Sequence, residues 1–247
     1  MRNIILFFSL ILLVTGCDKS TLESSSNSGT QNGVGGSLAR FTLAGNYLYI
    51  VEEATLKTFD VSAPANPVLK NTVVIGNNIE TIYPYKNNLF IGSQTGMFIY
   101  SIADPAAPKL SGSATHVRSC DPVVANDTAA FVTLRSGSFC GAPADGLYLY
   151  KITNLLSPQL VKNFTLPTPY GLGLKDSILF VCQGANGMSA INVKNINAPV
   201  VSQKITGHNF RDVIPYNDLL ICYVMDGIAL YDISNTANIR FINKVLN

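Results

Sequence analysis

Short apolar runs separated by turn residues recur along this chain with a nearly constant period. The clearest unit is the stretch from Asn46 to Val68, which returns four more times. Its anchor position is filled in turn by Tyr49, Phe90, Phe131, Phe180 and Ile221, at intervals of 41, 41, 49 and 41 residues. The longer interval contains an insertion between Leu134 and Asp145. Repeats of about forty residues made of strand-like runs are typical of a propeller or a related array.

Each repeat contains four strand-like runs. In the first repeat these are Arg40 to Ala44, Tyr47 to Glu52, Leu56 to Val61 and Val68 to Ile75. Turn-forming residues fill the linkers, and a proline recurs before the fourth run as Pro67, Pro108, Pro158 and Pro199. Solenoid repeats are shorter, so the pattern favours a propeller. We predict an all-β fold, a β-propeller of five four-stranded blades over residues 38–247.

The repeat resembles the LVIVD repeat, in which a strand of the type AYV precedes LxVxDVSxPxxP. Tyr49-Ile50-Val51 followed by Phe59 to Pro67 (FDVSAPANP) carries the resemblance, as does Leu230 to Ser234. Departures from the aspartate are Ser101, Lys151 and Asn192. The resemblance covers about residues 38–247. It implies a propeller on a bacterial surface or envelope protein. It therefore implies a cellular location and a fold, but no particular enzymatic activity.

The N-terminal segment predicts export and anchoring. Ile4 to Val14 is apolar except for Ser9, too short for a spanning helix of about 20 residues but suited to a signal peptide. Val14-Thr15-Gly16-Cys17 follows and resembles the lipobox of bacterial lipoproteins. The resemblance implies cleavage before Cys17 and acylation of that cysteine, which would anchor the protein in a lipid bilayer of the cell envelope. An ordinary cleaved signal is the alternative.

Residues 18–37 follow this segment and are rich in Ser, Gly and Asn. This composition predicts a flexible tether between the anchor and the propeller. Asp18, directly after the cysteine, resembles an inner-membrane retention signal of some enteric bacteria. The predicted organisation is therefore a signal peptide (1–17), a tether (18–37) and a propeller (38–247).

Composition and charge narrow the function classes. Hydrophobic residues make up 47% of the chain and charged residues 13%, which is enough apolar material for a sizeable core. The formal net charge is +2, and no run of Lys or Arg forms a basic stripe. Nucleic-acid binding needs such a stripe to neutralise phosphates, so it is not expected.

The order of strands in a blade sorts the polar residues between two faces. One face receives the loops between second and third strands and those between blades, and there we predict the ligand-face residues Glu80, Arg118, Asp121, Tyr170, His208, Arg211 and Asp212. Four of them precede the anchor of their blade by ten residues. The placement on this face rests on analogy with other propellers. The opposite face carries Asn and Asp turn residues without the spaced carboxylates of a calcium loop, so no metal site is expected.

The cysteines fall into two groups apart from Cys17. Cys120 and Cys140 are predicted on the same face of the third blade, where a disulfide would close a loop of about 20 residues and stabilise by roughly 3 kcal/mol. Spacing alone leaves that pairing open. Cys182 and Cys222 stand in apolar runs and are expected to be small buried hydrophobes. No Cys-x-x-Cys spacing points to zinc.

Catalytic motifs are missing from the sequence. It has no G-x-S-x-G, no P-loop and no H-E-x-x-H, so we expect neither an enzyme nor a cofactor. The leading hypothesis is a tethered binding or scaffolding module for a protein or glycan partner. The alternative is a glycan hydrolase using carboxylates at the channel mouth, for which Glu80, Asp121 and Asp212 are candidates. A purely structural spacer is the third hypothesis.

Ring closure is left open by the sequence. The repeats begin on a first strand and end on a fourth strand, so the ring could close by side-chain packing of the first blade on the last. A shift of phase, with one strand crossing over to complete a blade, is the other possibility.

Overall fold

The computed structural model describes residues 35–115, 122–137 and 144–246, and every regular element in these ranges is a β-strand. Blade 1 contains β1 (Phe41–Ala44), β2 (Tyr47–Glu52), β3 (Thr55–Asp60) and β4 (Val68–Val74). Blade 2 contains β5 (Ile79–Tyr85), β6 (Asn88–Ser93), β7 (Gly96–Ser101) and β8 (Lys109–Thr115). Blade 3 contains β9 (Val123–Ala125), β10 (Ala129–Leu134), β11 (Gly146–Lys151) and β12 (Gln159–Phe164).

The last two blades repeat this plan. Blade 4 contains β13 (Leu172–Lys175), β14 (Ile178–Cys182), β15 (Met188–Asn192) and β16 (Val200–Ile205). Blade 5 contains β17 (Phe210–Tyr216), β18 (Leu219–Val224), β19 (Gly227–Asp232) and β20 (Arg240–Leu246). Each sheet is antiparallel and takes its four strands consecutively from the sequence. The prediction of five four-stranded blades is confirmed.

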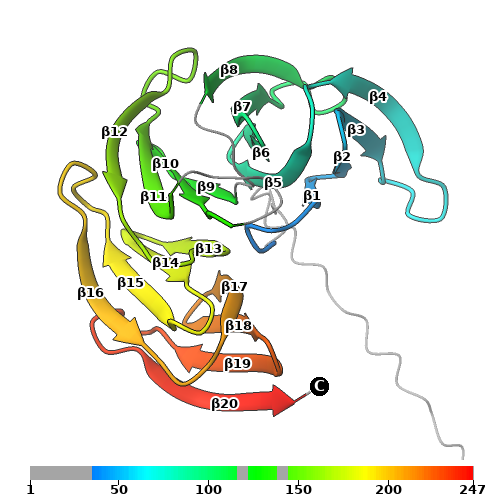
Figure 1. Ribbon diagram of the computed structural model, residues 1–247. Coiled ribbons are helices and arrows are strands. Elements are labelled where there is room, and N and C mark those ends of the chain that lie inside the picture. Colours follow the sequence, from blue (N-terminus) through cyan, green and yellow to red (C-terminus); the bar gives the residue numbers. More distant parts are fainter. Residues whose placement is uncertain (1–34, 116–121, 138–143, 247) are drawn as a thin grey trace, which may run out of the picture.

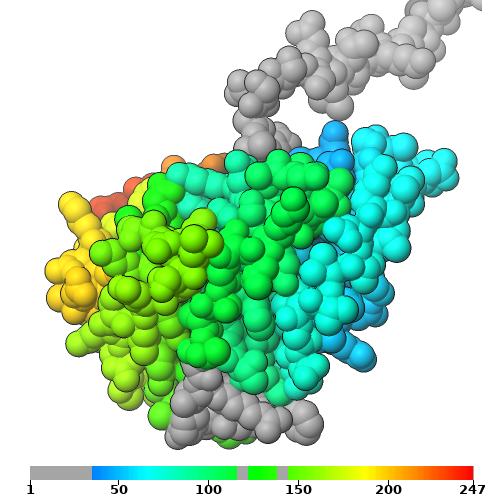
Figure 2. All heavy atoms as spheres, turned by 90° about the horizontal axis from the view of Figure 1, so that it is seen from above, coloured from blue at the N-terminus to red at the C-terminus, as the bar shows by residue number. Residues whose placement is uncertain are grey.

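The blades stand side by side around a common centre, with the first strand of each innermost and the fourth outermost (Figure 1). Seen from above, as spheres, successive blades follow one another along the rim from the cyan blade 1 to the yellow blade 4 (Figure 2). No strand crosses over to complete another blade. The alternative of a shifted phase is therefore not what the structure shows.

Successive residues of the second strand pack against different neighbours. Phe90 lies in a core shared with blade 3, whereas Leu89 and Ile91 lie in a core shared with blade 1. Side chains alternate between the two faces of a strand, so a blade with a neighbour on both sides needs apolar residues at every position. This explains why the second strands are continuous apolar runs, with β10 and β14 buried throughout.

The five blades form an open arc, and blades 1 and 5 are its ends (Figure 1). Leu48 and Ile50 occupy the places of Leu89 and Ile91 but are only half-buried. At the other end, Tyr223 is 50% exposed, and on blade 1 Phe41 is 63% exposed. Closure by packing of the first blade on the last, the other possibility left open by the sequence, is not observed either, because these two outward faces keep substantial solvent exposure.

A short strap before β1 connects the two ends across the centre. The Ser37 hydroxyl accepts a hydrogen bond from the Leu172 N–H (2.7 Å) and donates one to the Asp212 carboxylate (3.2 Å). Ser37 is buried. A Cβ on Gly36 would lie 2.1 Å from Asp212 Oδ2, so a larger residue there would displace the Asp212 carboxylate. The predicted tether, drawn through residue 37, extends too far, because Gly35 to Ser37 pack onto the propeller.

Candidate functional site

Two faces of the arc carry different kinds of polar residues. We call the face with the loops between second and third strands, and between blades, the loop face. The opposite one, with the tight turns between first and second strands and the links between third and fourth strands, is the turn face. The predicted ligand residues belong to the loop face. The turn face is described first, because it shows what the repeated polar residues do.

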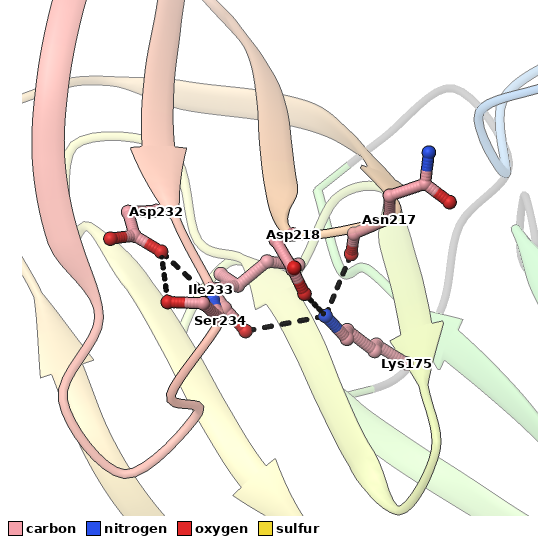
Figure 3. A network of polar contacts seen from close by, with 6 residues as sticks. All are labelled: Lys175, Asn217, Asp218, Asp232, Ile233 and Ser234. Carbon is pink, nitrogen blue, oxygen red and sulfur yellow. Dashed lines mark hydrogen bonds and ion pairs between the residues drawn. The ribbon is translucent and has the colours of Figure 1, made fainter.

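The aspartate of the repeat ends the third strand on the turn face. Asp60 Oδ1 accepts hydrogen bonds from the Ser62 N–H (3.0 Å) and hydroxyl (2.7 Å). Asp232 accepts the same pair from Ser234, at 2.9 and 2.6 Å (Figure 3). Ser101 and Asn192 replace the aspartate in blades 2 and 4 and still accept the N–H two residues later. The signature residue of the repeat therefore forms a turn.

A lysine joins two blades on the same face. Lys175, the last residue of β13 in blade 4, donates to the Asn217 carbonyl (2.7 Å), Asp218 Oδ1 (2.8 Å) and the Ile233 carbonyl (3.3 Å) of blade 5 (Figure 3). Lys86 of blade 2 pairs with Asp127 of blade 3 in the same way. These lysines and aspartates therefore link neighbouring blades.

The loop face over blades 3 to 5 has a different arrangement. The guanidinium of Arg135, just after β10, lies 4.3 Å from the centre of the Tyr170 ring, and that of Arg211, in β17, lies 4.4 Å from it. Cations over an aromatic face are attracted by its quadrupole, and Arg does this while its N–H groups remain able to bind an anion. Three blades thus contribute to one aromatic and cationic cluster, which we call the Arg-Tyr-Arg cluster.

Backbone contacts between blades hold the cluster in place. The Thr133 hydroxyl donates to the Tyr170 carbonyl (2.7 Å), and the Tyr170 N–H donates to the Cys182 carbonyl (2.8 Å). The Gly171 N–H donates to the Arg211 carbonyl (2.9 Å). Gly184 has φ +56, and a Cβ there would meet Tyr170 at 2.9 Å. Tyr170 therefore has a fixed position before any ligand arrives.

Arg211 has no acidic partner among the residues that the structure describes. It makes no ion pair there, and its side chain is half-buried. The carboxylate of the neighbouring Asp212 points to the strap. It accepts hydrogen bonds from the Ser37 hydroxyl and the Leu38 N–H (3.4 Å), and also from the N–H of Val213 (2.9 Å). A partly desolvated cation without a counter-charge is costly, which makes this position receptive to an anion.

Asn209 adds an unsatisfied polar atom beside the cluster. Its side-chain oxygen is buried and has no hydrogen-bond partner. It lies near Gly184, the glycine that also approaches Tyr170. The amide nitrogen contacts only the Met225 sulfur, at 3.6 Å. Buried amide oxygens are normally paired, and this one becomes accessible to a donor only when the Asn209 side chain turns towards the surface.

Among the described residues, Asp212 is a loop-face carboxyl whose pKa is strongly raised. Burial raises its pKa to about 6, although hydrogen bonds from Val213, Leu38 and Ser37 oppose the shift. Its geometry ties this carboxyl to the strap, so we assign it a structural role. The nearby thiols of Cys182 and Cys222 are free and buried, and burial raises the pKa of each.

The ends of the insertion in blade 3 are also structural. Asp145 accepts from the Ser136 N–H (2.6 Å) and hydroxyl (2.7 Å) and from the Thr168 N–H (2.7 Å). Burial would raise the pKa of Asp145, but these bonds outweigh it and hold the pKa below the usual range. Leu134 is fully buried. Removing residues 134–145 would therefore damage the blade as well as the loop.

Over blades 1 and 2 the loop face is acidic. A hollow of about 360 Å³ is lined by Glu53 and Glu80 together with neutral and basic residues, among them Arg40. The Arg40 guanidinium donates to the Ile79 carbonyl (2.9 Å), which fixes it between the two blades. A second cavity, of about 270 Å³, follows the centre of the arc and is lined mostly by apolar side chains such as Tyr83, Val124 and Leu172.

The structure separates the predicted ligand residues into groups. Tyr170, Arg211 and Asp212 come together, although Asp212 serves the strap. Glu80 lies over blade 2, apart from this group. His208 packs against Phe210 and Phe241, with ring centres 5.8 and 5.7 Å away. The remaining predicted site residues lie outside the described residues: Cys17, Arg118, Cys120, Asp121 and Cys140.

Sequence reasoning missed Arg135 and Ser37. Arg135 directly follows the buried strand β10. Because the end of this strand lies on the loop face, the position of Arg135 in the sequence could have identified it as a candidate. In the described ranges no group of three or more His, Cys, Asp or Glu side chains is arranged to hold a metal ion. Across the same ranges, no helix has the length and apolarity needed to span a membrane.

Comparisons with known proteins agree with the fold. The LVIVD repeat model matches residues 35–74, which is blade 1 with its strap. A search of curated protein sequences finds no match. A functionally unknown protein of Desulfotomaculum acetoxidans is similar in structure, with a TM-score of 0.65 and 13% identity, over 82% of this chain and 66% of that one.

Two further solved structures have similar folds. The periplasmic gluconolactonase PpgL of Pseudomonas aeruginosa has a TM-score of 0.61 and 12% identity, over 82% of this chain and 68% of that one. AztD of Citrobacter koseri has a TM-score of 0.59 and 12% identity, over 81% and 59%. At this identity the likeness concerns the fold alone, and this chain spans only about two thirds or less of most of these structures.

Proposed function

We propose that this LVIVD-repeat β-propeller is a membrane-tethered binding module of the bacterial cell envelope, which holds a protein or glycan partner on its loop face. The observation that carries the proposal is the Arg-Tyr-Arg cluster. It is fixed by contacts between blades, and its Arg211 has no acidic partner among the described residues. Rigid, preorganised groups of this kind bind with less entropic cost.

The contrast with the turn face supports this assignment. Several charges there already serve the fold, as Lys175 does with Asp218 and Asp232 with Arg240. On the loop face, Arg211 is a charged side chain without such an ion-pair partner among the described residues. Loops of several blades meet there, and binding residues are commonly carried by loops on a rigid scaffold.

Anchoring through Cys17 is the second part of the proposal. Its support is the apolar run from Ile4 to Val14 followed by Val14-Thr15-Gly16-Cys17, a resemblance to lipoprotein precursors. In a bacterial host fed a labelled fatty acid, the full chain should incorporate label and the Cys17→Ser variant should not. Equal labelling of both proteins, or of neither, would contradict the anchor.

A hydrolase is the alternative function, and it has its own supporting observation. Glu53 and Glu80 line the same hollow over blades 1 and 2, and paired carboxylates are what glycoside hydrolysis needs. The third candidate carboxyl, Asp212, is occupied by the strap. If this alternative holds, Glu80→Gln will abolish hydrolysis of an envelope glycan while thermal unfolding is unchanged.

The test of binding uses the full chain as bait in envelope extracts. Arg211→Gln removes a loop-face charge, and Lys175→Gln removes one charge from the turn face as its matched control. We expect a partner to be lost with Arg211→Gln and kept with Lys175→Gln. The same partner with both variants would contradict a loop-face site, and no partner with any form would favour the structural spacer.

A further inference from the structure

We propose that Arg211, Tyr170 and Asn209 form a subsite for the carboxylate of an acidic sugar. This inference rests on the proposed function, because it names the ligand chemistry of the same loop face. The guanidinium of Arg211 binds the carboxylate, and the Tyr170 ring holds that guanidinium in position. The Asn209 side chain forms a hydrogen bond with a group next to the carboxylate.

The charge of the subsite favours an oxyanion. The carboxylates of Asp145 and Asp212 are directed elsewhere, to Ser136 and Thr168 and to the strap. Asp226 pairs with Lys244 and Glu52 with Lys57. None of these four described carboxylates neutralises Arg211. A planar guanidinium that is stacked on a ring presents its N–H edge outward, in the geometry that a carboxylate accepts with two oxygens.

Asn209 distinguishes a sugar acid from a bare anion. Its buried side-chain oxygen lacks a hydrogen-bond donor. This oxygen becomes accessible when the Asn209 side chain turns towards the surface, and a ligand that then completes the site brings a donor close to its anionic group. A hexuronate has hydroxyl groups on the ring that bears its carboxylate, so one molecule can satisfy both Arg211 and Asn209.

The surroundings of the subsite are polar, which favours a sugar over an acidic peptide. Near Gly184 the Asn186 amide donates to the Thr168 hydroxyl (2.9 Å), and that hydroxyl donates to the Gln183 carbonyl (3.1 Å). Amides and hydroxyls of this kind suit the hydroxyl-rich rim of a glycan.

The experiment measures binding of trigalacturonate to the full chain in detergent by calorimetry at low salt. We expect binding to weaken about tenfold or more in Arg211→Gln, the loss of one charge-assisted contact. Arg211→Lys keeps the charge without the planar fork and should lie between the two. Lys175→Gln, the same charge change on the turn face, should bind as the unchanged protein does, as should the neutral Met225→Leu.

Several results would overturn the inference. These are equal binding by Arg211→Gln, binding of the neutral trisaccharide maltotriose at equal strength, and no binding of trigalacturonate at all. If inorganic phosphate or a triglutamate peptide binds as tightly as trigalacturonate or more tightly, the site recognises negative charge and does not recognise the sugar. All variants must remain folded at the temperature of the assay, and Arg211→Lys provides a second comparison if Arg211→Gln folds poorly.

Failure of this inference can be told apart from failure of the proposed function. If envelope partners are still captured through Arg211 while trigalacturonate does not bind, the loop face binds a different chemistry and the binding module stands. If capture fails as well, both proposals are wrong.

Discussion

The turn face and the loop face are made by the same repeat, yet they use their polar residues in opposite ways. On the turn face the same device recurs from blade to blade, as with Asp60, Asn192 and Asp232, each of which accepts the N–H two residues later. On the loop face the blades differ, and unlike residues such as Arg135, Tyr170 and Arg211 meet at one place. In a repeat protein, register positions filled by the same kind of residue in several blades are parts of the fold, and register positions filled by unlike residues, such as Tyr170 and Arg211, are the candidates for function.

The largest effect is expected from Asp212, the loop-face carboxyl that serves the fold. Its folded pKa of about 6 lies above the usual aspartate pKa of about 3.9, so the folded state holds its proton more tightly. Stability should therefore fall as pH rises from about 4 to about 6, by up to about 3 kcal/mol. Chemical denaturation across this pH range should show that slope in the unchanged protein and lose it in Asp212→Asn. A slope that persists in the variant would contradict the assignment.

A smaller loss is expected from the lysine that joins blades 4 and 5. Lys175→Met removes three hydrogen bonds, two of them to backbone carbonyls, and should lower the free energy of unfolding by about 1 to 2 kcal/mol. The matched control is Lys86→Met, whose lysine is 63% exposed in its pair with Asp127 and should cost less than about 1 kcal/mol. Equal losses in denaturant titrations would show that the buried carbonyl contacts contribute nothing.

The side-chain hydrogen bond that blade 3 lacks after its third strand offers a small gain in stability. Lys151 stands where other blades have Asp, Ser or Asn, and its side chain cannot accept the N–H that ends the third strand. Lys151→Asn should raise the free energy of unfolding by about 0.5 kcal/mol by supplying that acceptor. Lys151→Gln removes the same charge without forming the turn and should give no gain. If both variants behave alike, the charge and not the turn is responsible.

The smallest effect is the acid titration of Asp232. Hydrogen bonds from Ser234 and then from Arg240 lower its pKa to about 2. A lowered folded pKa gives stability that is present above about pH 4 and is lost as pH falls towards 2. Asp232→Asn keeps the turn and should flatten this part of the acid unfolding curve. An unchanged curve would mean that the ion pair with Arg240 is screened in solution.

The period of the sequence was sufficient to predict the blades, because successive side chains of a strand pack alternately against the two neighbouring blades. It was not sufficient to predict the open arc. Leu48 and Ile50 are as apolar as Leu89 and Ile91, so the pattern alone cannot tell a face with a neighbour from a face without one. Curvature arises from packing between blades and is not visible in a pattern of apolar positions.

The site was predicted in part for similar reasons. The shared register of Tyr170 and Arg211 placed both on the loop face, and the structure brings them together. Asp212 was expected to face a ligand, but a bulge between Phe210 and Asp212 shifts the register of β17, and the carboxyl meets the strap. Such local irregularities depend on the partner strand and leave no mark in a single sequence.

The most direct test of the division between the faces is site-specific photo-crosslinking of the full chain in its native membrane. A photoreactive residue would replace Asn209 on the loop face or the exposed Asn217 on the turn face. The account predicts a discrete adduct with an envelope component from position 209 and none from position 217. Adducts of equal yield from both positions, or from position 217 alone, would contradict it.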